Sequence, residues 1–455
     1  MDRDTKKPLT VGSDLVEWCS FPLGCVQSRR LEEGTMSSLL RIAAVIVLFG
    51  IAVLGLWPSS EQVLLSSLDR EAHPNTSEGE MAGVAAGNTR FAFELYEVVR
   101  EKDGNVLFSP YSITLAMAMI RVGAQGETER QLAEGLHFTL SQDRFHPALN
   151  ALSQGLDADD HDPFELRIAN ALWGQTGYPF RQEFLDTLAV HYGAGLRLID
   201  FEDDPEQARV AINRWIDRAT NGRIPGALPE GSVELEARFV LCNAIYFNAE
   251  WRHQFARQLT VDESFHLRSG ESVLVPMMRH DGPRMLRYAQ GAGYQAVELP
   301  YEGDRVSMLV LLPDEGEGVA FERALDVARW EEITTALSVR EVKLVMPKFC
   351  YADSMSLTEP LGALGVTDVF DSSAANLDGI SEKPLFLQMA FHQAFIDVNE
   401  ERTEAAAVTV SVGAEPALEE PVQVIVDRPF LFVIREKSTG TILFMGRVLD
   451  PRVGG

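Results

Sequence analysis

The residues of this chain that could carry covalent chemistry lack the spacing that catalysis requires. Its 455 residues contain no Gly-x-Ser-x-Gly turn, no His-Glu-x-x-His helix, no Cys-x-x-Cys pair and no phosphate-binding loop. The nine histidines are scattered along the sequence. We therefore expect a protein that is not an enzyme and that uses no metal and no other cofactor.

Residues 403–412 (TEAAAVTVSV) have a different capability, which is to join a sheet through their backbone. A permanent inner strand normally presents bulky side chains to a core, whereas this segment is poorly anchored anywhere. Small side chains, β propensity and an uncharged inner face suit a segment that enters an existing sheet. An alanine-rich exposed loop is the alternative. At a period of two, the small face consists of Thr403, Ala405, Ala407, Thr409 and Ser411.

The flanking sequence is typical of an exposed loop. Residues 399–402 (NEER) are polar, and residues 414–421 (AEPALEEP) contain two prolines and three acidic residues that break any regular element. Strand-like apolar sequence resumes at residues 422–434. The segment in front of residue 422 is therefore predicted to be a loop between two strands.

The elements that must hold this loop mix helical and strand periods. Residues 91–100 and 207–220 have helical spacing, and the second places Ile212, Trp215 and Ile216 on one face. Residues 306–312 and 342–347 are typical of strands. Because strands and helices do not alternate regularly, the predicted fold class is α+β.

Charge and the N-terminal sequence limit the partners and the location. A formal net charge of -27 argues against nucleic acid and against an anionic membrane surface as partners.

Residues 42–57 are an uncharged apolar run, preceded by Arg29, Arg30 and Arg41 and followed by Glu61 and Asp69. This asymmetry predicts an extracytoplasmic protein, either secreted or anchored in the membrane through residues 42–57 if they stay uncleaved. The bulky end of the run favours a retained signal anchor.

The sequence predicts four regions. Residues 1–35 are a cytoplasmic tail or a start-site artefact, because Met36 offers a second start, and residues 36–58 are the signal anchor or signal peptide. Residues 59–87 are polar, with one proline and three glycines, and are predicted to be a linker. The remaining residues, 88–455, form the main domain.

From about Asn88 to its end, the chain resembles the serpins, a family of serine-protease inhibitors. The resemblance implies the serpin fold, in which mixed sheets are surrounded by helices and a reactive loop is exposed and mobile. The segments that carry it are residues 105–113 (NVLFSPYSI), 239–247 (FVLCNAIYF), 299–303 (LPYEG), 307–313 (SMLVLLP), 345–349 (VMPKF), 375–380 (ANLDGI), 424–434 (VIVDRPFLFVI) and 443–447 (LFMGR).

The resemblance implies inhibition by a suicide-substrate mechanism. A target protease attacks the loop and forms an acyl-enzyme, and the freed segment then inserts as a new strand in the large sheet. The residues implied by motif are a polar shutter cluster of Ser109, Ser112, Asn243 and His392, a breach with Trp251 and Lys348, and a hinge of Glu400, Glu401, Arg402, Thr403, Glu404, Ala405, Ala406 and Ala407. Lys348 and Glu400 match a salt bridge at the head of the loop.

Arg402 departs from the family pattern, which usually has glycine after the two acidic residues of the hinge. Glycine supplies the backbone freedom for the turn from strand to loop, so its absence puts efficient inhibition in doubt. A non-inhibitory serpin that binds or chaperones a partner is therefore the alternative function, and a surface-tethered adhesive module ranks third.

Serpins activated by heparin carry a basic helix near residues 140–163, but that segment is acidic here, so no heparin activation is expected.

Two spacing counts, one from each side of the loop, limit the position of the scissile bond. Family spacing counted forward from Glu400 gives Pro416, and spacing counted back from Pro429 gives Leu418. Proline disfavours cleavage after residues 415, 416 and 420. Two bonds remain: Ala417–Leu418 suits an elastase-like protease, and Leu418–Glu419 suits a chymotrypsin- or subtilisin-like one. We favour the Leu418–Glu419 bond.

Overall fold

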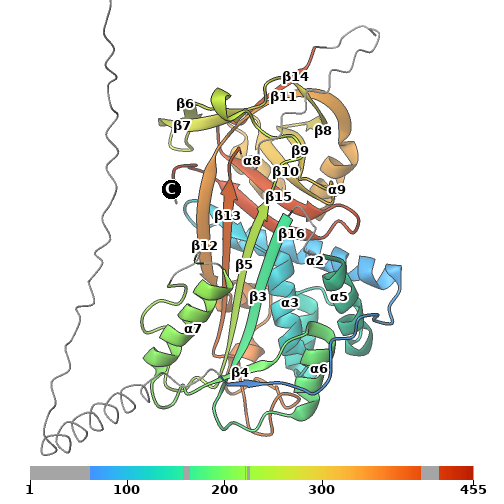
Figure 1. Cartoon of the computed structure of the whole chain (residues 1–455), viewed down its shortest axis with the longest axis vertical. Coiled ribbons are helices and arrows are strands. Elements are labelled where there is room, and N and C mark those ends of the chain that lie inside the picture. Colours follow the sequence, from blue (N-terminus) through green and yellow to red (C-terminus); the bar gives the residue numbers. More distant parts are fainter. Residues whose placement is uncertain (1–61, 157–163, 221, 223–225, 401–419, 454–455) are drawn as a thin grey trace, which may run out of the picture. The chain divides into compact units, whose positions relative to one another are not determined.

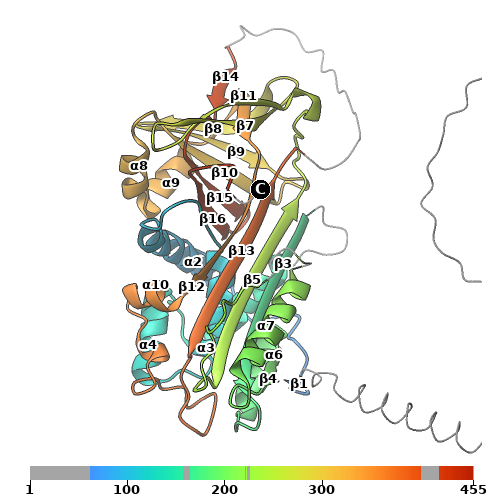
Figure 2. The same cartoon turned by 90° about the vertical axis from the view of Figure 1, so that its left-hand side faces the viewer.

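The central strand shows how the larger folded unit is built. The computed structural model describes residues 62–156, 164–220, 222, 226–400 and 420–453, and in it β5 (Phe239–Ala249) is buried from residue 239 to residue 247. A strand covered on both sides belongs in the middle of a sheet. Accordingly β5 pairs antiparallel with β3 on one side and parallel with β13 on the other. This six-stranded sheet has the order β1-β4-β3-β5-β13-β12 (Figures 1 and 2). Its other strands are β1 (Gln62–Leu64), β3 (Phe164–Gln175), β4 (Leu196–Ile199), β12 (Phe349–Ser356) and β13 (Met389–Val398).

Alternate residues of β5 pack into two different cores. Leu241 and Ile245 face the main core, which includes residues of α2 and α3. Val240 and Ala244 face a second core, in which Ile212 of α7 is fully buried. The α-helices of the described chain are α2 (Glu78–Val99), α3 (Pro110–Arg121), α4 (Gly126–Gly135), α5 (Gln142–Leu156), α6 (Gln182–Tyr192), α7 (Pro205–Ala219), α8 (Gly318–Ala324), α9 (Val327–Ala336) and α10 (Thr358–Ala363), with 3-10 turns at Arg257–Leu259 and Asp368–Phe370.

A second, ten-stranded sheet has the order β2-β16-β15-β10-β9-β8-β11-β7-β6, and β14 lies beside β11. β14 is parallel to β11 and is the first strand after the predicted loop. The strands are β2 (Val106–Phe108), β6 (Val261–His266), β7 (Ser272–Arg279), β8 (Arg284–Gly291), β9 (Tyr294–Pro300), β10 (Val306–Pro313), β11 (Ser338–Pro347), β14 (Val422–Ile425), β15 (Phe430–Glu436) and β16 (Ile442–Val448).

The predicted class and most predicted elements are confirmed. Mixed sheets and interspersed helices make the fold α+β. The helix predicted at residues 207–220 is α7, and the strands predicted at 306–312 and 342–347 lie within β10 and β11. Local periodicity was sufficient for these elements because each buries one face or both.

The prediction of a linker over residues 59–87 is wrong for its described part. Residues 62–64 form β1, and α2 begins at Glu78 rather than near residue 91. Ser77 caps α2 by accepting a hydrogen bond from the amide of Glu80, whose carboxylate accepts one from the amide of Ser77. Three glycines in the first ten residues of α2 lower its helix propensity and hid this start from the pattern.

The predicted tail and apolar segment, residues 1–58, lie outside the described residues. Among the helices that the structure describes, none is both long enough and apolar enough to span a bilayer.

Candidate functional site

The boundary between β5 and β13, here called the seam, is incomplete at one end. The two strands pair in parallel from Val240 opposite Met389 to Tyr246 opposite Phe395. Beyond this point β5 stays paired with β3 up to Ala249, and β13 stays paired with β12 up to Val398. The final three residues of β5 are thus still paired with β3, and those of β13 with β12, but β5 and β13 are no longer paired with each other.

This geometry suits the addition of a strand. β13 ends at the open end of the seam, so a segment following it that turned back into the seam would run antiparallel to both β13 and β5. One parallel ladder would then be replaced by two antiparallel ladders, which are slightly more stable per residue.

Trp251 closes the open end of the seam. Its ring is stacked on Tyr301, with centroids 4.4 Å apart and planes 12° from parallel. Its indole N–H donates to the carbonyl oxygen of Asn399 at 3.0 Å. Trp251 follows β5 and Asn399 follows β13, so this hydrogen bond links the ends of the two strands across the open end of the seam.

An ion pair fixes the point at which the described chain enters the loop. The Nζ of Lys348, between β11 and β12, lies 2.7 Å from Oε2 of Glu400, whose side chain is only 4% exposed. Burial is the largest single influence and would raise the pKa of Glu400, but the hydrogen bonds to its carboxylate, first among them that from Lys348, together with the charge of Lys348 outweigh burial, and the pKa is lowered. The carboxylate therefore stays charged at neutral pH and holds the last described residue before the loop.

A buried polar cluster lies under the middle of the seam. The amide of Ser109 donates to Nε2 of His392 at 3.0 Å, and the hydroxyl of Ser109 caps α3 by accepting from the amide of Ser112 at 3.1 Å. The Asn243 amide donates to the carbonyl oxygen of Ser112 at 3.1 Å and also contacts the hydroxyl of Ser112. Nδ1 of His392 contacts Oδ1 of Asn243, its register partner across the seam.

The protonation state of His392 follows from these contacts. Burial lowers its pKa to about 3, so the ring is neutral. Because Nε2 accepts from Ser109, the proton must be on Nδ1, where it is donated to Asn243.

Histidine burial predicts a loss of stability in mild acid. Desolvation lowers the pKa of His146 to about 3 and that of His280 to about 4, as it does for His392. In the unfolded chain these rings protonate below about pH 6.5, whereas in the folded protein they stay neutral, so the unfolded state binds more protons. Each histidine is thus expected to lower the unfolding free energy by up to about 1.4 kcal/mol per pH unit below pH 6.5 and above its folded pKa.

Urea unfolding at pH 7.5, 6.5, 5.5 and 4.5 measures this effect. His392→Gln should make the decline in unfolding free energy shallower, whatever it does to the stability at pH 7.5. A slope in the variant equal to that of the parent protein would contradict the assignment of a neutral buried histidine.

Two residues at the site, Asn170 and Arg181, were not identified from the sequence. Asn170 of β3 lies opposite Asn243 in register, and its Oδ1 contacts the Asn243 amide. Arg181 lies at the end of the seam away from the loop, where its amide donates to the carbonyl oxygen of Ile380 at 2.9 Å and its Nε to that of Asp378 at 2.6 Å. Asn170 could have been found from the sequence, because it is a polar residue within an apolar part of β3. No local sequence feature identifies Arg181.

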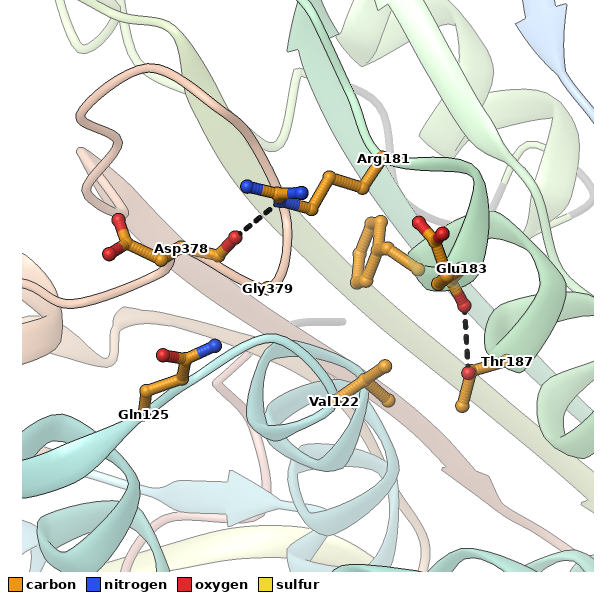
Figure 3. Close-up of a pocket in the computed structure, with 8 residues that line it drawn as sticks. Val122, Gln125, Arg181, Glu183, Thr187, Asp378 and Gly379 are labelled. Carbon is orange, nitrogen blue, oxygen red and sulfur yellow. Dashed lines mark hydrogen bonds between the residues drawn. The ribbon is translucent and has the colours of Figure 1, made fainter.

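Arg181 borders an open cleft of about 580 Å³ between α3, α6 and the segment that leads to β13. Figure 3 shows its guanidinium reaching Asp378 beside Gly379, with Val122 and Gln125 on the opposite side. The backbone there is closely packed, since a Cβ on Gly379 would lie 2.7 Å from Cα of Gly123. These contacts join the β3 side of the seam to the β13 side.

The structure thus brings together Ser109, Ser112, Asn243 and His392, and it places Trp251, Lys348 and Glu400 at the open end of the seam. Their roles stay predictions. The remaining hinge residues and the candidate scissile bonds lie outside the described residues: Glu401, Arg402, Thr403, Glu404, Ala405, Ala406, Ala407, Ala417, Leu418 and Glu419. No group of three or more histidine, cysteine or carboxylate side chains that could hold a metal occurs in the described part of the chain.

Comparison with known proteins identifies the family to which this architecture belongs. The family model described as "Serpin (serine protease inhibitor)" matches residues 86–451. The leukocyte elastase inhibitor of Bos taurus is 38% identical over 82% of this chain and 100% of its own length, and that of Homo sapiens is 36% identical with the same coverage. An uncharacterized serpin-like protein of Methanosarcina acetivorans is 34% identical over 83% of this chain and 88% of its own length.

Solved structures agree with these matches. Uncleaved ovalbumin aligns with a TM-score of 0.74 at 30% identity, over 81% of this chain and 100% of the ovalbumin chain. Native protease nexin-1, solved with heparin, aligns with a TM-score of 0.73 at 27% identity, over 82% of this chain and 100% of its own. The protein with the incomplete seam between β5 and β13 is therefore a member of the serpin family.

Proposed function

We propose that this serpin inhibits a serine protease by acting as a suicide substrate. The serine Oγ of the protease attacks the carbonyl carbon of Leu418 and forms an ester with it. The Leu418–Glu419 amide bond breaks, and Glu419 leaves with a proton on its new amino group. The freed segment that begins near Thr403 then enters the seam as a strand and carries the esterified protease with it.

The observation that supports this proposal is the open end of the seam beside the root of the loop. Glu400 is held there by Lys348, and Trp251 contacts the residue before it. A strand entering at this end gains backbone hydrogen bonds to β5 and β13, each worth on the order of 1 kcal/mol net. Summed along a strand, these bonds favour the inserted form.

The polar cluster supports the same mechanism. A seam lined only by apolar side chains would lose packing at every position when it opened. Asn243 and His392 instead exchange hydrogen-bond partners, and the N-cap of α3 lies within reach of both. The barrier to opening is lowered because neither side chain has to be left without a partner.

The target that we propose is an elastase-, chymotrypsin- or subtilisin-like protease. No lysine or arginine lies between Arg402 and Arg428, so a protease that needs a basic residue in its first pocket has no bond to cut within residues 403–427. Relatives that carry the name leukocyte elastase inhibitor are consistent with this class.

A covalent complex tests the function. Incubation with an elastase, a chymotrypsin or a subtilisin should give a band that survives SDS and has the combined mass of the inhibitor and the protease. Trypsin serves as the contrasting protease and should give no such band. Complete cleavage of the loop by every protease, without any stable band, would rule the mechanism out.

The alternative function is a non-inhibitory serpin that binds or chaperones a partner. Arg402, at the usual glycine of the hinge, is the observation that favours it. Arg402→Gly separates the two functions. If the protease only cleaves the parent protein but forms the covalent complex with the variant, then Arg402 alone makes the parent non-inhibitory, and the rest of the fold is still able to inhibit.

We also propose that the serpin domain acts outside the cytoplasm, tethered through residues 42–57, with residues 1–35 as a tail or a start-site artefact and no heparin activation. The flanking charges support the orientation. Arg144 of α5, the helix that would have to be basic, is engaged with Glu80. Fractionation should recover the intact chain with membranes, whereas a soluble mature protein beginning near Glu61 would show that the segment is a cleaved signal.

A further inference from the structure

Residues 62–77, here called the strap, precede the part of the chain that the family model matches, which begins at residue 86. The strap adds β1 to the edge of the six-stranded sheet, where Gln62, Val63 and Leu64 pair antiparallel with β4. It then runs past α6 and α5 to the start of α2 (Figure 1, blue segment). The edge of the sheet farthest from the seam is therefore held by the strap.

One set of contacts attaches the strap to the β5 side of the seam. The hydroxyl of Ser66 donates to Oδ1 of Asp186 at 2.6 Å, and the amide of Glu71 donates to the carbonyl oxygen of Val190 at 2.9 Å. Both partners are on α6, which lies between β3 and β4 in the chain. Any displacement of β3 and β4 is thus transmitted to the strap through β1 and α6.

A second set of contacts attaches the strap to α5. Nε of Arg70 donates to Oδ1 of Asn150 at 2.9 Å, and Nη2 donates to the hydroxyl of Ser153 at 3.1 Å. The amides of Asn150 and Gln154 donate to the carbonyl oxygen of Glu71 at 3.0 and 2.8 Å. Asn150 is 1% exposed, so the strap completes the hydrogen bonding of a buried amide on α5.

α5 belongs to the helical body under the sheet. Arg144 of α5 donates twice to the carboxylate of Glu80 on α2, at 2.6 and 2.7 Å. The strands on the other side of the seam are also bonded to that body. The hydroxyl of Tyr351 on β12 donates to the carbonyl oxygen of Val106 at 3.0 Å, and His392 of β13 accepts from Ser109.

The β5 side is bonded to the body as well, since the Asn243 amide donates to the carbonyl oxygen of Ser112 at 3.1 Å and Tyr192 of α6 contacts His146 of α5 at 2.6 Å. The strap is strained by an opening in which the β5 side moves relative to that body.

Opening the seam for a strand requires a displacement of roughly 4.8 Å, the spacing between neighbouring strands. Hydrogen bonds do not survive a stretch of that size. When the β5 side moves relative to α5, the strap, which is bonded to both, must lose some of its contacts. We infer that the strap is a restraint on seam opening: it holds the uncleaved form and slows strand insertion. This inference rests on the proposed insertion mechanism.

Gly195, next to β4, allows the strap to be displaced with one substitution. A Cβ at this position would lie 2.7 Å from the carbonyl oxygen of Leu64 and 2.5 Å from Cδ2 of Leu65. Gly195→Ala should therefore push the strap away from β4, and Arg70→Ala independently removes its contacts to Asn150 and Ser153. Gly155→Ala is the matched control, because that glycine is on α5 and its Cβ would meet nothing within 4 Å.

The test uses the full chain and an N-acetylated synthetic peptide with the sequence of residues 403–412, whose uptake is followed by native mass spectrometry. No protease is present. Gly195→Ala and Arg70→Ala should take up the peptide about threefold to tenfold faster than the parent, which is the effect expected from losing one or two net hydrogen bonds. Gly155→Ala should match the parent.

Each outcome decides one of the two claims. If both variants take up the peptide at the parental rate or more slowly, the strap does not restrain opening, although insertion itself stands. If none of the four proteins takes up the peptide, the proposed insertion mechanism fails and the inference fails with it.

Discussion

Thr403→Arg is expected to convert the protein from an inhibitor to a substrate. Thr403 begins the small face of the segment, so it is the first inward-facing residue to enter the sheet. An unpaired guanidinium buried there would cost several kcal/mol and stall insertion, while the protease still completes hydrolysis of its ester. The covalent complex should fall to a small fraction of the parental amount, and the cleaved serpin should accumulate in its place.

Glu404→Arg is the matched control, because residue 404 lies on the opposite face of the same strand. Its charge would stay in solvent after insertion, so the yield of complex should stay close to that of the parent. The ratio of complex to cleaved serpin, read from an SDS gel at several ratios of serpin to protease, measures both variants. Wild-type stoichiometry for Thr403→Arg would show that the assignment of the two faces is wrong.

The Leu418–Glu419 bond is expected to be the bond that the target protease cuts. It agrees with the spacing counted back from Pro429, on the side of the loop where the described chain resumes at Glu420 and pairs as β14. Mass spectrometry of the peptide released on complex formation should give a fragment that begins at Glu419. A fragment beginning at Leu418 would instead assign the loop to an elastase-like protease, and any other start would contradict the alignment of the loop.

Leu418→Arg should change the class of protease that is inhibited. A basic residue before the scissile bond fits the acidic first pocket of a trypsin-like protease and not an apolar one. The variant is expected to form a covalent complex with trypsin, which the parent does not, and to inhibit chymotrypsin at least about a hundredfold more slowly. Ala417→Arg is the control, since it changes the adjacent residue. A larger gain toward trypsin from Ala417→Arg would move the scissile bond by one residue.

The sequence by itself determined the elements that bury one face or both. In α7 the spacing of Ile212 and Ile216 predicted a helix, and both side chains are fully buried against the sheet. The mostly apolar residues 306–312 predicted a strand in the same way, and every residue of β10 is buried. These signals are local, because each residue contributes to a period that is visible within a few turns of the chain. The motif resemblance supplied the names of the polar residues near the seam, and their roles still await the experiments above.

The tertiary structure alone decided how distant segments meet. The strap was predicted to be a linker because its residues are polar and lack a period, yet Arg70 and Asn150, eighty positions apart, are hydrogen-bonded. The contacts of Arg181 with Asp378 and Ile380 span nearly two hundred positions and leave no local pattern either. The early end of the ladder between β5 and β13 depends on the paths of two strands, and so no feature of either strand's sequence reveals it. Hydrogen bonds between irregular segments are set by geometry in space, whereas hydrophobic periodicity is set by geometry along the chain.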